Sequence, residues 1–302
     1  MTPRVLVAGG TGRLGTLVTG LLSSGGFSVR VLTRDPQRAA HLVDRHVEVV
    51  TGDVRDPATL TAATTGVEVV ISAVHGFAGP GGGTPATIDR DGNVNLIQAA
   101  RSAGADVVLM SGVGAAPDSP LELFAMKHAA EVELAASGVS WTIVRASAFL
   151  ELWVELLTGT AGRSNRPLVF GRGQNPINFV SVGDVAALVA RVVTDPQTRG
   201  QTLQIGGPDN VTMTDLARLV MASSGDSREP RHLPRAALRV VAGTVGRVRP
   251  ELGRQVRAAL AMDRYDMTFA ADIGADAVRA RFTDLPRTSA AEVLQGMRAA
   301  AR

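Results

Sequence analysis

The beginning of the chain places a glycine-rich turn between an apolar strand and a helix. The apolar run VLVAG at residues 5–9 passes directly into GGTGRLG, in which Gly9, Gly12 and Gly15 form a GxxGxxG pattern. A helical pattern follows at once, over residues 13–24. Glycines at these spacings permit a tight turn, close approach of backbone N–H groups to a pyrophosphate, and close packing of helix on strand. The pattern therefore predicts the first βαβ unit of a dinucleotide-binding sheet.

Short apolar runs alternate with helical patterns through the first half of the chain. Near-continuous apolar strands separated by helices are typical of a parallel sheet covered on both faces. We therefore expect an α/β fold with a doubly wound parallel sheet of the Rossmann type. The expected strands lie at 5–9, 29–33, 47–50, 67–74, 105–111 and 141–147, and the expected helices at 13–24, 36–43, 57–64, 88–103 and 122–137.

The regular alternation weakens after residue 150. Residues 1–150 are expected to form the dinucleotide-binding core, completed by a strand and helix at about 177–206. Residues 151–176 and 207–302, with their Pro and Gly breaks, are expected to form a smaller, mostly helical substrate lobe.

The composition excludes several classes of site. No cysteine is present, which excludes disulfides, iron–sulfur clusters, zinc–thiolate sites and thiol nucleophiles. The five histidines show no metal-ligand spacing, so we expect no metal site. A net charge of +3 gives nucleic-acid binding little support. No apolar run approaches the roughly 20 residues of a membrane span, and the first strand begins too early for a signal peptide. We therefore expect a cytoplasmic protein with no integral membrane span.

The second expected strand ends in VLTRDP, where this topology places the residue that meets the adenosine ribose. Thr33 and Arg34 stand where an NAD-selective site has a carboxylate. Because a guanidinium pairs bidentately with a phosphate, Arg34 favours NADP(H) over NAD(H), and Arg13 in the glycine loop is a second candidate for this contact. The alternatives are that Asp35 binds the ribose of NAD and that Arg34 is only a solvated side chain.

Two other segments follow strands at the carboxyl edge of the sheet, where ligands lie in this topology. Asp53 and Val54 come after the third strand and are expected to border the adenine, although a helix-capping role for Asp53 competes. Ala73 and Val74 end the fourth strand and are expected to line the path of the cofactor. The glycine-rich stretch 76–85 that follows either folds over a ligand or is a surface loop without such a role.

Lys127 is the only lysine in the chain, beside 30 arginines. A bias toward arginine replaces any lysine that serves only as a surface charge. An ammonium is a compact donor on a flexible stem, whereas guanidinium is planar and permanently charged. Lys127 is therefore predicted to do something that arginine cannot, the alternative being chance survival at a surface position.

In this order, the motifs of the chain resemble the atypical short-chain dehydrogenase/reductase superfamily, in its NmrA-like, NAD(P)-binding branch. The resemblance covers most of the chain and is carried by GGTGRLG, VRVLTR, GDV, DRDGNVNLIQAARSAGADVVLMSGVGA, KHAAE, SGVSWTIVRASAF, FVSVGDVA and GGPDNVTMTDLA. It implies a Rossmann fold with NAD(P) across the strand ends and a substrate under the C-terminal lobe. The expected cofactor-binding residues are Gly9, Thr11, Gly12, Arg13, Leu14, Gly15, Arg34, Asp53, Val54, Ala73, Val74 and Lys127.

The resemblance also assigns catalytic positions. The superfamily uses a serine after the fifth strand and a YxxxK pair on the next helix, in which the Tyr is general acid/base and the Lys binds the nicotinamide ribose. Ser111 and Lys127 match the serine and the lysine, but Leu123 occupies the Tyr position and Asp89 that of a usual asparagine. Leucine has no proton to give, so Lys127 or a bound water is expected to replace the phenol. His75, at the end of the fourth strand, is either a second proton donor or a histidine bonded to backbone.

Three functions follow from these positions. The first is an NADPH-dependent oxidoreductase that reduces a small apolar, quinone-like or conjugated carbonyl substrate without the usual Tyr. The second is a non-catalytic, NADP(H)-sensing regulatory protein of the NmrA-like kind, and the third is a structural subunit with bound NADPH. A homodimer or a protein partner stays open in all three.

Two segments outside the core carry open interpretations. Trp153 and its neighbours after the sixth strand form either an apolar pocket wall or an amphipathic helix packed on the core. The stretch 228–257 contains eight arginines and two glutamates, and is either a solvated face or a basic surface for an anionic membrane or acidic partner.

Overall fold

The computed structural model describes residues 3–43, 47–77, 83–248, 250–269 and 276–300. Two compact units divide the chain. The first unit comprises Met1–Ala146, Gly183–Ile205 and Ala277–Pro286, and the second comprises Ser147–Val182, Gly206–Asp276 and Arg287–Arg302. Each unit is therefore built from three separate stretches of sequence.

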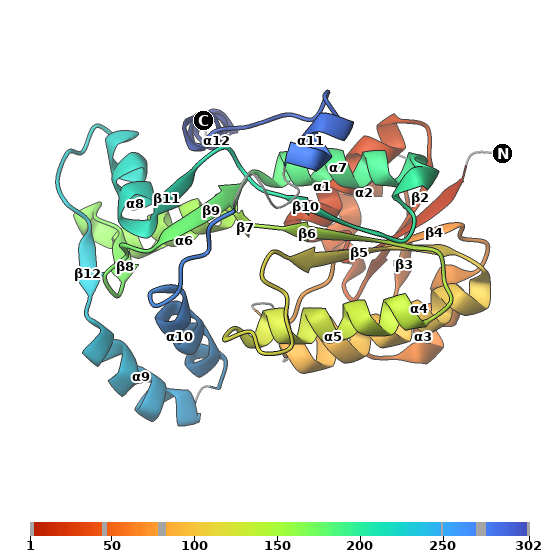
Figure 1. Ribbon diagram of the computed structural model, residues 1–302, viewed down its shortest axis with the longest axis horizontal. Coiled ribbons are helices and arrows are strands. Elements are labelled where there is room, and N and C mark those ends of the chain that lie inside the picture. The colour runs from red at the N-terminus through yellow and green to blue at the C-terminus, as the bar shows by residue number, and fades with distance from the viewer. Residues whose placement is uncertain (1–2, 44–46, 78–82, 249, 270–275, 301–302) are drawn as a thin grey trace. The chain divides into compact units, whose positions relative to one another are not determined.

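Seven strands form the central sheet of the first unit in the order β10-β6-β5-β4-β1-β2-β3, and every neighbouring pair is parallel. Helices cover both faces, with α3, α4 and α5 on one side and α1 and α7 on the other (Figure 1). The doubly wound fold expected from the sequence is confirmed. The strands are β1 (Arg4–Ala8), β2 (Ser28–Thr33), β3 (Glu48–Thr51), β4 (Val69–Ser72), β5 (Asp106–Gly112), β6 (Trp141–Ala146) and β10 (Gln201–Ile205).

The helices of the first unit connect these strands. Most begin where the apolar period changes from two to about four residues, and Asp35, Asp56 and Asp195 accept hydrogen bonds from backbone N–H groups at three of the helix starts. They are α1 (Arg13–Ser24), η1 (Pro36–Ala39), α2 (Ala40–Val43), α3 (Pro57–Thr64), η2 (Pro85–Arg90), α4 (Asp91–Ala103), α5 (Glu122–Ala136), α7 (Val182–Thr194), η4 (Pro196–Thr198) and α11 (Asp276–Arg281).

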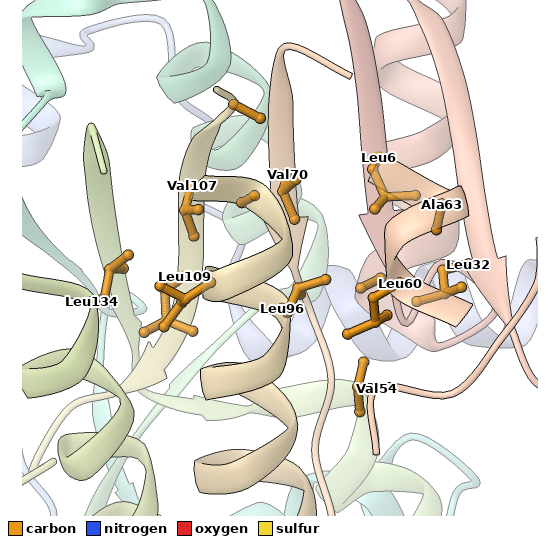
Figure 2. Close-up of a cluster of buried hydrophobic side chains, with 14 of the residues drawn as sticks. Leu6, Leu32, Val54, Leu60, Ala63, Val70, Leu96, Val107, Leu109 and Leu134 are labelled. Atoms are coloured by element: carbon orange, nitrogen blue, oxygen red, sulfur yellow. The ribbon is translucent and has the colours of Figure 1, made fainter. Parts of the chain in front are cut away.

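The core of the first unit lies between the sheet and helices α3 to α5. Leucine, valine and alanine side chains from β1, β4 and β5 face Leu60, Ala63 and Leu96 on the helices, as Figure 2 shows. Burying each large aliphatic side chain contributes about 1.5–3 kcal/mol relative to exposure. This packing fixes the strands and so sets the position of every loop at their carboxyl ends.

The second unit has two small sheets and several helices. Its core gathers Leu150 and Val154 from α6 with Leu216 from α8, and Trp153 packs edge-on against Phe179 with ring centroids 6.4 Å apart. The elements are β7 (Ala148–Phe149), α6 (Leu150–Ala161), η3 (Gly162–Ser164), β8 (Leu168–Phe170), β9 (Pro176–Val180), β11 (Asn210–Thr212), α8 (Met213–Ala222), β12 (Arg231–Leu233), α9 (Arg235–Val248), α10 (Pro250–Met262) and α12 (Ala290–Ala300).

Two segments belong to a different unit from the one that the sequence predicted. Strand β9, in the stretch expected to return to the main sheet, pairs instead with β7 and β11 in the second unit, and only α7 and β10 join the first. Residues 277–286, expected in the substrate lobe, belong to the first unit. An apolar strand pattern shows that a strand forms but not which sheet it joins, because the pairing partner is distant in sequence.

Candidate functional site

A cavity of about 510 Å³ opens in the first unit at the carboxyl ends of the central strands. Its walls come from the segments that follow β1, β2, β3 and β4, on both sides of the point where the strand order reverses. Open α/β sheets bind ligands at such a switch point, and the volume lies within the roughly 300–1,000 Å³ of cofactor pockets. The lining residues are Gly9, Thr11, Gly12, Leu32, Thr33, Arg34, Asp35, Arg38, Gly52, Asp53, Val54, Arg55, Ala73, Val74, His75, Gly76, Gly83 and Ile88.

The glycine loop forms one wall of this cavity and is shaped by two close approaches. Gly9 has a φ of +81°, and a Cβ there would lie 2.7 Å from the Ala73 carbonyl oxygen. A Cβ on Gly15 would lie 2.2 Å from the Gly9 carbonyl oxygen. Only glycine permits both contacts, so the turn brings the N-terminus of α1 directly against the cavity.

The N-terminus of α1 suits a phosphate group. Its N-cap residue is Gly12, no side chain caps the first turn, and that turn contains no acidic residue. The backbone N–H groups of this turn and the positive end of the helix dipole therefore favour anions. These features fit the pyrophosphate of a dinucleotide.

The predicted cofactor residues fall into two groups. Nine of the predicted site residues line the wall of the cavity, and His75 is one of them. Leu14 and Gly15 are buried behind the loop, and Arg13 is exposed outside the wall. Ser111 and Lys127 do not line this cavity either. The nine are Gly9, Thr11, Gly12, Arg34, Asp53, Val54, Ala73, Val74 and His75.

Arginines gather at the end of the cavity that follows β2 and β3. Arg34 and Arg38 line the wall, while Arg55 binds Asp53 through its Nε, 3.0 Å from Oδ1, and its Nη2, 2.5 Å from Oδ2. The hydrogen bond from Arg55 holds the pKa of Asp53 below its usual value. Asp35 accepts from the Gln37 N–H at 3.0 Å and so caps η1. Both nearby carboxylates are thus already bonded within the chain.

Sequence reasoning missed Arg38 and Arg55. A signal for each was present. Arg38 stands four residues after Arg34 at the start of an expected helix, and Arg55 stands two residues after Asp53 in the same loop. Both positions are close enough in sequence to reach the same edge of the cavity.

Lys127 is buried in the second turn of α5, in the same unit. Its Nζ lies 3.0 Å from Oδ1 of Asp89 and donates to the Met110 carbonyl oxygen at 3.1 Å. An ammonium has three N–H groups, so these two contacts leave at least one for a ligand. Asp89 itself has no exposed surface, and its Oδ2 accepts from the Gly76 backbone N–H at 2.7 Å.

Ser111 and His75 lie at the ends of neighbouring strands β5 and β4. The Ser111 hydroxyl is buried, and its oxygen has no hydrogen-bond partner among the described residues. The pKa of His75 lies below its usual 6.5, first because the cavity walls displace water from the imidazole and then because the Lys127 ammonium repels a second charge. Asp89 acts in the opposite direction. The lowered pKa favours the neutral ring at pH 7, although the residue is exposed to solvent.

No described residue of the first unit supplies the phenol that is missing from α5. Leu123, one turn before Lys127, is half-buried, and Tyr265 lies in the second unit with 45% of its surface exposed. The site therefore offers an ammonium, a hydroxyl and a neutral imidazole as its proton-bearing groups.

A model of the NAD(P)H-binding protein family matches residues 9–196 of the chain. The chain belongs to this family. The match begins at the glycine loop and extends through all of the segments that line the cavity. The family confirms the resemblance inferred from the motifs and identifies the cofactor class as NAD(P)H.

Three characterised relatives are similar to this member of the family. The NAD(P)H azoreductase of Xenophilus azovorans is 30% identical over 223 residues, which cover 73% of this chain and 74% of that protein. Photosystem II assembly factor Ycf39 of a Synechocystis strain is 28% identical over 243 residues, covering 78% and 72%. Quinone oxidoreductase 2 of Escherichia coli is 27% identical over 247 residues, covering 80% and 82%.

A crystal structure of the E. coli NADPH-dependent quinone oxidoreductase in complex with NADPH shares the fold. It matches with a TM-score of 0.76 and 22% identity, over 97% of this chain and 99% of that one. Among the residues that the structure describes, no helix is both long and apolar enough to cross a membrane.

Proposed function

We propose that the chain is an NADPH-dependent oxidoreductase that reduces a small apolar, quinone-like or conjugated carbonyl compound. The observation that carries the proposal is the buried Lys127 ammonium, held by Asp89 and Met110 near the carboxyl end of β5. A protein that only binds a dinucleotide needs the glycine loop and the cavity. In such a protein the buried ammonium could only hold the cofactor, whereas in a reductase it can also supply a proton.

The choice of NADP(H) over NAD(H) rests on charge at the adenosine end of the cavity. Arg34 and Arg38 present guanidinium groups there, while Asp35 and Asp53 are bonded to neighbours and are poorly placed to accept from two ribose hydroxyls. A 2′-phosphate is matched by guanidinium in geometry and charge. The arrangement therefore favours the phosphorylated dinucleotide.

Proton delivery without a phenol is the second part of the proposal. Bound NADPH supplies a hydride, and the reduced acceptor then needs one proton at oxygen. Lys127 holds a proton close to the strand ends and can pass it on directly or through water. Ser111, whose buried oxygen has no partner among the described residues, orients the acceptor by a hydrogen bond.

A small apolar pocket of about 40 Å³ lies in the second unit, lined by Trp153 and Leu157 from α6 with Phe170, Ile177 and Met213. It is smaller than the roughly 300 Å³ at which ligand pockets begin, so the choice of substrate rests on the relatives. The azoreductase and the quinone oxidoreductase are named for extended, conjugated acceptors.

A second candidate function is binding of NADP(H) without turnover, in a regulatory or assembly role. Two observations favour it: Leu123 in place of a proton-donating side chain, and the similarity to a photosystem assembly factor. In this role Lys127 would only hold the cofactor.

The test is consumption of NADPH, followed by its absorbance, with a panel of quinones, enones and aldehydes. We expect turnover that falls at least about 100-fold in Lys127→Met and survives in His75→Ala. Lys127→Arg is the matched control, because it keeps the charge but not the compact shape and should also lose activity. Tight NADPH binding with no turnover across the panel would establish the second candidate instead.

A further inference from the structure

Asp89 occupies an unusual position in the backbone. It lies in η2, a π-helical segment of six residues that precedes α4. π-Helical turns are rare and often occur at functional sites. Thr84 and Thr87 close the start of this segment with a reciprocal capping box. The segment is therefore well defined, and its register decides where the Asp89 side chain lies.

The Asp89 carboxylate joins two parts of the site. Oδ2 accepts from the Gly76 N–H at 2.7 Å, and Oδ1 lies 3.0 Å from the Lys127 Nζ. Gly76 lines the cofactor cavity directly after His75, whereas Lys127 belongs to α5. One side chain thus connects the loop after β4 with the only lysine.

The surroundings of Asp89 hold it in place. The Asn93 amide donates to the Asp89 carbonyl oxygen at 2.8 Å and accepts from the Ser72 hydroxyl at 2.5 Å. Both side chains are almost fully buried. The carboxylate is therefore anchored through its own backbone to the end of β4.

A buried ion pair gives little net stability, because the desolvation of two charges offsets their attraction. Removing one partner is strongly destabilising, whereas an apolar pair of similar volume is often as stable as the ion pair. Stability alone does not account for a carboxylate at position 89. Its position between Gly76 and Lys127 gives a second reason.

We propose that Asp89 is a positioning residue for Lys127. Its carboxylate fixes the ammonium and the Gly76 backbone in one geometry, so that the remaining N–H of Lys127 is directed at the cofactor or acceptor. This inference rests on the proposed function and adds a residue to it. An asparagine there has a single acceptor oxygen, and it cannot serve the Gly76 N–H and the ammonium equally.

The single lysine makes the first test direct. Protein grown on lysine labelled with ¹³C at Cε gives one side-chain resonance, which belongs to Lys127. We expect this resonance to move in Asp89→Asn and, in the wild type, on addition of NADPH. The matched control is Asp184→Asn, which alters another fully buried carboxylate of the same unit and should leave the resonance in place.

The second test is a double-mutant cycle on NADPH turnover. Asp89→Asn should lower kcat by about 100-fold, the effect of a misplaced catalytic group, with a smaller change in the KM for NADPH. In the Lys127→Met background the same change should have no further effect, because the residue through which Asp89 acts is gone. Equal losses in both backgrounds would overturn the inference.

The outcomes separate the inference from the proposed function. An unmoved lysine resonance in Asp89→Asn rejects the positioning role even if the wild type consumes NADPH. A moved resonance without any turnover in the wild type supports the pairing and rejects the enzyme. If Asp89→Asn does not fold, folding of the Asp89→Asn/Lys127→Met double variant supports the coupling, and its failure to fold makes Asp89 a packing residue instead.

Discussion

His75 illustrates how one residue of the site depends on its neighbours. The imidazole lines the cavity at the end of β4, and its pKa is lowered by the displacement of water and by the Lys127 ammonium. Asp89 partly counteracts both effects. At neutral pH the uncharged ring is a weak proton donor, so in the proposed reaction the proton would come from another group. The sequence left open whether His75 donates a proton near neutral pH or is bonded to backbone.

The same shift predicts how stability depends on pH. The folded state disfavours protonated His75, so the unfolded chain binds more protons between the lowered pKa and 6.5. Stability from this residue is fully present above pH 6.5 and is lost as the pH falls toward the lowered pKa. The Tm of the wild type should therefore fall more than that of His75→Gln between pH 7.5 and pH 5. If calorimetry gives the same decline in Tm for both proteins, the pKa of His75 is not lowered in the folded state.

The lining of the cavity was predictable where local sequence carried the information. The glycine loop, Arg34, Asp53 and the segment before His75 follow strands at the sheet edge, and that order is visible in the sequence. The partnership of Asp89 with Lys127 was not, because the two residues are far apart in sequence and meet only through packing. Lys127 stood out by its rarity, and its rarity says nothing about its partner.

At the scale of the element, α1 shows strong local determination. Its bounds match the expected 13–24, because the glycines fix its start and Leu14, Val18 and Leu22 repeat at helical spacing on its buried face. The π-helical register of η2 had no such signal. The sequence predicted only a helix over 88–103, whereas the π-helical segment begins at Pro85 and holds Asp89 in contact with Gly76 and Lys127.

A substitution in α1 tests whether the loop binds the cofactor. In Gly15→Ala the new Cβ would lie 2.2 Å from the Gly9 carbonyl oxygen and must displace the loop, at a cost of about 1–3 kcal/mol. We expect NADPH to raise the Tm of the wild type but not of Gly15→Ala. The control is Gly159→Ala in α6, where no atom lies within 4 Å of the new Cβ, and the Tm should rise slightly while the response to NADPH persists. An equal response in Gly15→Ala would remove the loop from the binding site.

For the molecule as a whole, the sequence indicated a Rossmann core and a second lobe, and the fold class is confirmed. The sequence did not show which distant segments would pack together in one unit. Residues 277–286 return to the first unit, where Arg279 lies 3.5 Å from the buried Asp184 carboxylate and the guanidinium of Arg191 lies over the Phe282 ring, 6.0 Å from its centroid. Partners so far apart are chosen by three-dimensional packing, and no local pattern encodes them.

The Arg-rich stretch 228–257 is only partly explained by the structure. Arg228 pairs with Asp226, Arg231 donates to backbone carbonyl oxygens, and Arg235 binds Asp263 in the second unit. These three arginines therefore have partners within the chain. A basic surface for a membrane or an acidic protein stays a prediction for the rest of the stretch.

The central claim is that the first unit binds NADPH in its cavity, with the 2′-phosphate beside Arg34. The most direct measurement is calorimetric titration of the protein with NADPH and with NADH. The account predicts one NADPH per chain, with a Kd at least about 10-fold lower than that of NADH because of charge-assisted phosphate contacts. Arg34→Ser should remove most of this preference, while the exposed Arg101→Ser should retain it. Absence of saturable NADPH binding, or equal affinities in the wild type, would contradict the account.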